Sequence, residues 1–254
     1  MSLKAVLFDL NGVIINDDSI HEELIKQILI EENLTLKKGE YQEVCLDKCD
    51  RAILRELLAS RGRVKSEDYL TELLNRKAES YALELEKVEK LPLYPGLDDL
   101  IFQVRSRNLK LGLVSDAIRK EISLVLERAK LAEYFKVIVA GDDIATSKPE
   151  PDGYLLAVER LNQEYTDLNL QASECLVIED TPAGIEAGKR AGMQVLGVAN
   201  TYPFHMLQRC CNWTVDYLTD LELERIEKVF SHYEAQQSRQ ANARIADGSW
   251  QKDN

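Results

Sequence analysis

Acidic side chains follow two of the apolar runs in this sequence, where a carboxylate can act as a nucleophile or a metal ligand. Asp9 ends the run KAVLFD, and the neighbours Glu179 and Asp180 end LVIED. A carboxylate can attack phosphorus to give an acyl phosphate, and carboxylate oxygens suit a hard cation such as Mg²⁺. Because Glu179 and Asp180 are adjacent, they would repel each other, and a bound cation removes that cost.

Two further side chains have the chemistry to hold an anion such as a phosphoryl group. Ser115 follows the apolar run LKLGLV, and its hydroxyl and the next backbone amides, at the start of a predicted helix, are neutral donors. Lys148 adds fixed positive charge, which stabilises a transferring phosphoryl group. Since Lys148 precedes Pro149, it is expected in an extended loop rather than in a helix.

Short apolar segments that alternate with helical periodicity predict the elements that position these residues. Strands alternating with helices of ten or more residues indicate an α/β fold, a doubly wound parallel sheet covered on both faces. Ligands of such sheets bind beyond the carboxyl ends of the strands, so the acids, Ser115 and their neighbours are expected to converge there. The predicted strands are residues 4–9, 109–115, 137–140, 176–180 and 194–198.

A long segment between the first two predicted strands has helical periodicity and few strand signals. It leaves after the first strand and returns at LPLYPG, so we expect a helical cap hinged over the site. The predicted division is a core domain of residues 1–16 and 91–230, a cap domain of residues 17–90 and a polar tail of residues 231–254. The apolar faces of the insert are Ile20, Leu24, Ile28 and Leu29, then Ile53, Leu57 and Leu58, then Leu70, Leu73 and Leu74.

Composition limits the classes of partner. The net charge of −12 and the pI near 4.9 argue against nucleic acid or an anionic membrane, and no block of Lys or Arg overrides that field. No apolar run reaches the length of a membrane span, and the N-terminus lacks a signal-peptide pattern, so we expect a soluble, cytoplasmic protein. The odd number of cysteines, five, suits reduced thiols, and a metal site at Cys45 and Cys49 is disfavoured because no histidine accompanies them.

Four separated motifs together resemble the haloacid dehalogenase superfamily, and within it the capped phosphatases and the mutases of the beta-phosphoglucomutase type. The resemblance runs from about residue 3 to residue 221, and any one motif alone would be weak. The resemblance implies a hydrolase acting on a small phosphorylated metabolite. The motifs are FDLNGVI at 8–14, GLVSDA at 112–117, SKPEPDGYLLA at 147–157 and VIEDTPAGIEAGKRAG at 177–192.

The same resemblance assigns a role to each candidate residue. Asp9 is the implied nucleophile, and the Mg²⁺ ligands are the side chains of Asp9 and Asp180 and the backbone carbonyl of Asn11. Glu179 contributes directly or through water. The implied substrate-binding groups are Ser115, Asp116, Lys148 and His21.

Asn11 departs from the family pattern, which has an acid two residues after the nucleophile. An amide has no proton to exchange near neutral pH, so general acid–base catalysis worth roughly 10²–10⁴-fold is missing unless another group supplies it. His21, where similar mutases have a cap-hinge histidine, and Asp17 or Asp18 are candidate substitutes.

Three readings of Asn11 stay open at this point. The chain is a native enzyme with a substitute acid or a good leaving group, a weakened enzyme that binds phosphorylated ligands, or an engineered trap. A non-catalytic binder of a phosphorylated metabolite is the competing class of function. A sugar-phosphate mutase is disfavoured because Asn11 argues against the proton transfers of its cycle. A dehalogenase is also disfavoured, because Ser115 and the acidic pair Glu179 and Asp180 favour a phosphate and a metal.

Overall fold

The computed structural model describes residues 2–45 and 48–231. Its centre is a six-stranded parallel sheet in the order β3-β2-β1-β4-β5-β6. Strands β2 and β3 lie on one side of β1, and β4, β5 and β6 lie on the other side. The strands are β1 (Ala5–Phe8), β2 (Lys110–Val114), β3 (Val137–Val139), β4 (Cys175–Glu179), β5 (Gln194–Val198) and β6 (Trp213–Val215). The five predicted strands are therefore confirmed, and β6 is an additional edge strand.

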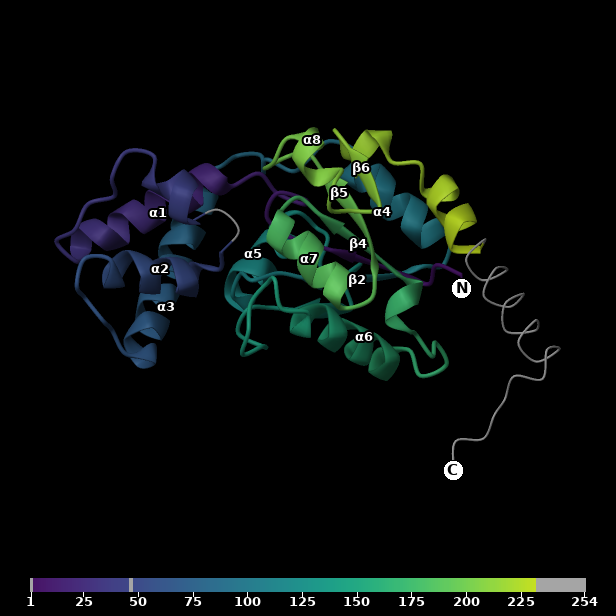
Figure 1. Ribbon diagram of the computed structural model, residues 1–254, viewed down its shortest axis with the longest axis horizontal. Coiled ribbons are helices and arrows are strands. Elements are labelled where there is room, and N and C mark those ends of the chain that lie inside the picture. The colour runs from purple at the N-terminus through teal and green to yellow at the C-terminus, as the bar shows by residue number, and fades with distance from the viewer. Residues whose placement is uncertain (1, 46–47, 232–254) are drawn as a thin grey trace, which may run out of the picture.

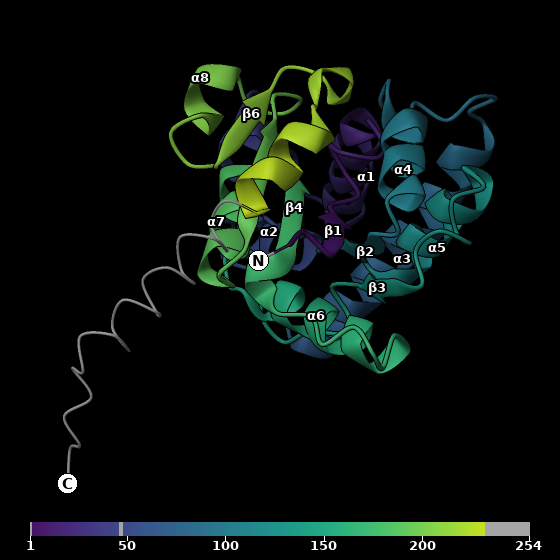
Figure 2. The same cartoon turned by 90° about the vertical axis from the view of Figure 1, so that its right-hand side faces the viewer.

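Helices cover both faces of this sheet, as the periodicity predicts. Side chains alternate along β1, so Leu7 packs with the helices on one face and Val6 and Phe8 pack with those on the other. Figure 2 shows α6 and α7 on one side of the sheet and α4 and α5 on the opposite side. The core helices are α4 (Leu97–Ser106), α5 (Arg119–Arg128), α6 (Asp152–Glu164), α7 (Pro182–Arg190) and the short α8 (Phe204–Leu207).

The insert after β1 is helical, with no strand of the sheet among its described residues. It contains α1 (Asp18–Glu31), a π-helical turn (Tyr41–Cys45), α2 (Asp50–Ala59) and α3 (Glu67–Glu86), which lie together at the left of Figure 1. These helices share a hydrophobic cluster of their own, which includes Leu29, Leu54 and Leu73. The α/β fold with an inserted helical segment is confirmed. That this segment is a cap domain, with boundaries at residues 16/17 and 90/91, remains a prediction.

The two connections of the insert run side by side. The backbone amide of Asn16 donates to the carbonyl of Pro92 at 2.9 Å, and the amide of Tyr94 donates to the carbonyl of Ile14 at 3.1 Å. The chain therefore leaves the core and returns to it at one place, next to the loop that follows β1.

Three further expectations concern the chain as a whole. All five cysteines are free thiols. Within residues 2–45 and 48–231, no helix is both long and apolar enough to cross a membrane. The predicted polar tail lies, apart from Ser231, outside the described residues.

The cluster within the insert generates a prediction about stability. Leu54 in α2 is fully buried in it, whereas Leu83 in α3 is 60% exposed. Leu54→Ala should lower the free energy of unfolding by about 2–5 kcal/mol, because it removes buried methyl groups and leaves a cavity. Leu83→Ala, the matched control, should change it by less than about 0.5 kcal/mol. Urea unfolding followed by circular dichroism measures both, and equal losses would contradict the separate core of the insert.

Candidate active site

The loops beyond the carboxyl ends of three neighbouring strands carry the predicted chemistry. Phe8 of β1 pairs with Leu113 of β2 and with Ile178 of β4, so the residues that follow these strands are brought to one edge of the sheet. Asp9, Ser115 and Asp180 come directly after β1, β2 and β4. The structure therefore brings together residues more than 170 positions apart in the sequence, as the parallel arrangement predicts.

Three buried carboxyl groups meet at this edge. One oxygen each from Asp9, Glu179 and Asp180 lies within 4.8 Å of the others. Oδ1 of Asp180 is buried and has no hydrogen-bond partner among the described residues, while its Oδ2 accepts a hydrogen bond from the hydroxyl of Thr201. Burial, and then the charges of Glu179 and Asp9, hold the pKa of Asp180 well above its ordinary value. An unpartnered buried oxygen among three carboxyl groups fits the ligand set of a hard divalent cation.

Lys148 supplies the positive charge at this edge. Its Nζ lies 2.9 Å from Oδ1 of Asp9 and 2.6 Å from Oε1 of Glu179, and it also donates to the carbonyl of Val114 at 3.3 Å. Burial opposes the charged form of Lys148, but the charges of Asp9 and Glu179 raise its pKa well above the ordinary value. Burial nevertheless raises the pKa of Asp9 to about 7, against the lowering effect of Lys148. The ammonium of Lys148 thus contacts two of the three carboxyl groups, and its single positive charge does not neutralise all three.

Two glycines leave the space in which these carboxyl groups lie. A Cβ at Gly12, whose φ is +75°, would stand 1.8 Å from Oδ2 of Asp180, and a Cβ at Gly184 would stand 2.0 Å from the carboxyl carbon of Glu179. Gly184 also donates its amide to the hydroxyl of Thr181, which caps the start of α7. The acids can lie this deep only because neither neighbour carries a side chain.

Three residues that sequence analysis did not single out complete this arrangement. The hydroxyl of Tyr154 donates to Oε1 of Glu179 at 2.7 Å, Thr201 donates to Asp180, and the amide of Asn200 donates to the carbonyl of Gly12 at 2.6 Å. Tyr154 is part of the motif SKPEPDGYLLA, which offered a signal for it. Asn200 and Thr201 lie in the turn after β5, and no pattern in the sequence marks them.

Ser115 and Asp116 line the same pocket as Asp9 and Lys148. Ser115 is buried, and its Oγ accepts a hydrogen bond from the amide of Ala117 at 3.1 Å, which leaves its proton free to donate. Burial raises the pKa of the Asp116 carboxyl, although the charge of Lys148 lowers it. The neutral donors predicted to hold an anion therefore stand next to the nucleophile candidate.

The side chain of Asn11 points to the beginning of the insert. Its Nδ2 donates to Oδ1 of Asp17 at 2.9 Å and lies 3.2 Å from Nε2 of His21, while Nε2 lies 3.1 Å from Oδ2 of Asp17. The ammonium of Lys77 lies 2.8 Å from Nδ1 of His21, and because an ammonium can only donate, Nδ1 accepts. Nε2 then carries the proton and donates it to Asp17, so the contact between Nε2 and Asn11 is not a hydrogen bond.

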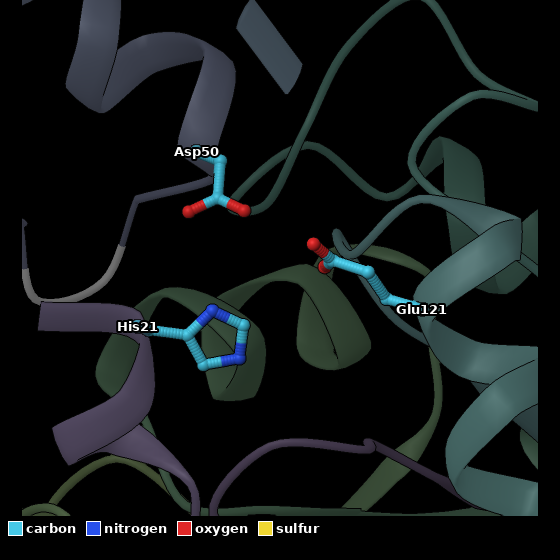
Figure 3. A group of neighbouring side chains, drawn as sticks. All are labelled: His21, Asp50 and Glu121. Atoms are coloured by element: carbon cyan, nitrogen blue, oxygen red, sulfur yellow. The ribbon is translucent and has the colours of Figure 1, made fainter. Parts of the chain in front are cut away.

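Lys77 occupies the middle of a second polar cluster, between the insert and the core. Figure 3 shows His21, Asp50 and Glu121 pointing toward one another, a set that by type and proximity resembles a metal site. Lys77 Nζ lies 2.7 Å from Oδ2 of Asp50 and 3.0 Å from Oε1 of Glu121, besides its contact with His21. The three hydrogens of the ammonium match these three acceptors, so Lys77 fills the place that a metal would take.

Lys77 was missed by sequence analysis although its spacing marks it. It stands three residues after Leu74 and four before Tyr81, on the buried face of α3, where a lysine is out of place. Its side chain is 0% exposed, and the acids that balance it come from α2 and α5. A charged residue on an apolar helix face requires buried partners, but the sequence does not say which.

A pocket of about 140 Å³ lies between the edge of the sheet and the insert. Core residues Asp9, Ser115 and Lys148 line one side, and His21 and Asp50 of the insert line the other. All eight of the predicted site residues except Glu179 line it, and Glu179 contacts Lys148 directly behind it. The cap and the core therefore enclose the site jointly.

Comparison with known proteins agrees with this architecture. The model of the haloacid dehalogenase-like hydrolases matches residues 6–198. The chain belongs to this family. Both the resemblance seen in the motifs and the prediction of an enzyme are thereby confirmed.

Relatives within the haloacid dehalogenase-like family cover most of the chain. It is 28% identical to the beta-phosphoglucomutase of Bacillus subtilis, over 93% of this chain and 99% of that protein. It is 30% identical to the phosphoglycolate phosphatase of Aquifex aeolicus, over 75% of this chain and 82% of that protein. A solved HAD hydrolase of family IA, variant 3, from Entamoeba histolytica shares the fold, with a TM-score of 0.78 at 22% identity, over 90% of this chain and 99% of that chain.

The contact between Gly12 and Asp180 generates a second prediction. Gly12→Ala should lower the free energy of unfolding by about 1–2 kcal/mol for the left-handed backbone and by roughly 1–3 kcal/mol more for displacing the Asp180 carboxyl. Gly62→Ala is the matched control, because Gly62 has a φ of +72° and nothing within 4 Å of an added Cβ. Urea unfolding of the two variants separates strain from collision, and equal destabilisation would count against the close approach of Gly12 to Asp180.

Proposed function

We propose that the chain is a Mg²⁺-dependent phosphatase that hydrolyses a small phosphorylated metabolite through an aspartyl-phosphate at Asp9. The observation that carries the proposal is the cluster of Asp9, Glu179 and Asp180, with one ammonium and one unpartnered buried carboxylate oxygen. The names of the relatives, a beta-phosphoglucomutase and a phosphoglycolate phosphatase, support a phosphoester as substrate.

The proposed chemistry has two displacements at phosphorus. Oδ of Asp9 forms a bond to phosphorus while the ester P–O bond breaks, and the leaving oxygen takes up a proton from solvent. Water then forms a bond to the phosphorus of the aspartyl-phosphate while the P–O bond to Asp9 breaks, and it loses a proton to solvent, which gives inorganic phosphate and the free Asp9 carboxylate. Ser115 and the amides after it hold the phosphoryl oxygens, and Lys148 neutralises part of their charge.

The Mg²⁺ site would consist of the side chains of Asp9 and Asp180 and the backbone carbonyl of Asn11, with Glu179 joining directly or through water. When bound, the ion supplies the charge neutralisation that an anionic nucleophile needs to approach a phosphate dianion. The Asp180 oxygen without a partner fits this role.

Asn11 determines how the protons are handled. Its amide is a donor to Asp17 and has no proton to give to a leaving oxygen. The Nε2 proton of His21 points to Oδ2 of Asp17, whose Oδ1 accepts from the Asn11 amide, and Nε2 lies 3.2 Å from the Asn11 nitrogen, so His21 holds a proton close to position 11. The reaction therefore favours substrates whose leaving oxygen needs little protonation. A weakened or non-catalytic binder of the same phosphorylated ligand is the second candidate, and the amide at position 11 is the observation that favours it.

Substitution of the nucleophile tests the reaction itself. Asp9→Asn should abolish turnover of a panel of phosphomonoesters in the presence of Mg²⁺, because an amide cannot form the acyl phosphate. Chelation by EDTA should abolish wild-type turnover, Mg²⁺ should restore it, and Ca²⁺ should inhibit, since Ca²⁺ bonds at longer distances. Release of inorganic phosphate is the measurement. Ligand binding without turnover over the whole panel would favour the binder instead.

The amide at position 11 generates a fourth prediction. In Asn11→Asp the new carboxyl would lie next to Asp17, so one of the two would keep a proton, which is the form that a general acid needs. Turnover of alkyl phosphates should rise by roughly tenfold or more, and that of acyl phosphates much less, because acyl leaving groups need little protonation.

The control for this prediction is Asn16→Asp, the same chemical change at an exposed position of the hinge. It should leave kcat/KM unchanged for both classes of substrate. If Asn11→Asp leaves alkyl and acyl phosphates equally unaffected, the missing-acid account is wrong, and His21→Ala and Asp17→Ala become the informative variants.

A further inference from the structure

The cap side of the pocket is rich in carboxyl groups. Asp18 and Asp50 of the insert line it, and Asp116 of the core joins them. Among the described residues, the cations that line the pocket are Lys48 and Lys148. The leaving group of a substrate would lie away from the phosphoryl site, next to these acids. The electrostatic potential there therefore depends on whether the two lysines are paired with other groups.

Both lysines are already paired. Lys148 contacts Asp9 and Glu179 at the reaction centre. Lys48, which lines the pocket, forms an ion pair with Glu56 of α2, and the two side chains are 36% and 51% exposed. Lys148 is therefore unavailable to a second anionic group of a substrate, and such a group could use Lys48 only by replacing Glu56 in an exposed ion pair.

Lys77 lies close by and is equally unavailable. Its ammonium is saturated by His21, Asp50 and Glu121, its side chain is 0% exposed, and it does not line the pocket. It offers one positive charge to two carboxyl groups. The cap thus contains a buried lysine, Lys77, near the active site. The residue that lines the pocket is not Lys77 but its acidic partner, Asp50.

Asp50 is that acid, and it contacts Lys77 and also lines the pocket. Its Oδ2 lies 2.7 Å from the Lys77 ammonium, and its side chain is 20% exposed, so its carboxylate is within reach of a ligand in the pocket. Burial opposes ionisation of Asp50, but the charge of Lys77 holds its pKa below the ordinary value. A carboxylate oxygen that faces a pocket can accept a hydrogen bond from a hydroxyl or an ammonium group and repels an anion.

We propose that this hydrolase takes a phosphomonoester whose leaving group carries no second anionic group, and that Asp50 selects it by accepting a hydrogen bond from a hydroxyl or ammonium group. That the substrate is hydrolysed at phosphorus rests on the proposed function, whereas the selectivity rests on the charges of the residues that line the pocket. A carboxylate or a second phosphate on the leaving group would face Asp18 and Asp50, and it would have to draw Lys48 away from Glu56 to be neutralised. Among the substrates that Asn11 allows, those whose leaving group carries hydroxyl or ammonium groups and no second anion are the class that remains.

Binding of two phosphonates tests the selectivity without requiring turnover. 2-Aminoethylphosphonate and phosphonoacetate are similar in size, and neither is hydrolysed as a phosphate ester, but one carries an ammonium and the other a carboxylate. Isothermal titration with MgCl₂ present should give a Kd about tenfold lower for the aminoethyl compound, the result of like-charge repulsion in one case and attraction in the other. Equal or tighter binding of phosphonoacetate overturns the proposal.

The variant Asp50→Asn tests whether Asp50 is the selecting residue. Because Lys77 can only donate, the amide oxygen would stay on Lys77 and the amide nitrogen would face the pocket, which replaces an acceptor with a donor. The ratio of the two Kd values should fall by about fivefold or more.

Two matched variants isolate the cause. Glu121→Gln loosens the same Lys77 contact but does not change the pocket lining, and Asp68→Asn removes one exposed acid elsewhere on the insert. Both should keep the wild-type ratio. A shift in Glu121→Gln as large as in Asp50→Asn would assign the effect to loosening of the cap and overturn the role of Asp50.

Turnover separates this inference from the proposed function. Phosphoethanolamine, 2-hydroxyethyl phosphate and 2-phosphoglycolate are two-carbon phosphomonoesters that differ in the charge of the leaving group. The first two should have a kcat/KM about tenfold above that of phosphoglycolate. If none of the three and no acyl phosphate is hydrolysed while the phosphonate order holds, the phosphatase proposal fails and the selectivity stands. Hydrolysis with phosphoglycolate preferred defeats the selectivity alone.

Discussion

The arrangement of this protein depends on three carboxyl groups that are held together out of water with one ammonium between them. Burial and mutual repulsion both act against ionised Asp9, Glu179 and Asp180. The parallel sheet brings them together, Lys148 balances part of their charge, and hydroxyl donors from Tyr154 and other side chains satisfy part of what remains. A divalent cation and a phosphoryl group are the partners that such a charge distribution is suited to receive.

The same problem is solved differently at the junction of the insert and the core. Lys77 is also a buried lysine between two acids, but there each hydrogen of the ammonium has its own acceptor. Among the described residues each cluster has a buried carboxylate oxygen without a hydrogen-bond partner, Oδ1 of Asp180 in the first and Oε2 of Glu121 in the second, but Asp180 lines the pocket and Glu121 does not. In the second cluster, all three hydrogens of the Lys77 ammonium have acceptors, and the carboxylate of Asp50 lines the pocket. An ion pair that joins the insert to the core therefore also contributes negative charge to the pocket.

Much of the fold and of the reaction centre could be predicted from the sequence, because both depend on local patterns. Apolar runs that end in acids predict β1 and β4 with Asp9 and Asp180 at their ends, whereas β6 was missed because a strand of three half-buried residues is too short to form a pattern. Asp50 and Thr201 could not be predicted, since their roles arise from contacts between distant elements. The partner of Asn11, Asp17, lies only six residues away, but its position depends on the turn of the hinge.

The hydrogen bonds between the two connections of the insert determine how changes in the insert affect the stability of the core. Because Asn16 bonds to Pro92 and Tyr94 bonds to Ile14, the core closes the insert as a single loop with fixed, adjacent ends. The entropy of closing a loop grows only with the logarithm of its length, so a longer or shorter insert changes the stability of the core little. The core can therefore exchange one insert for another while Asp9 keeps its place, and circular permutation through the insert should leave the sheet order intact.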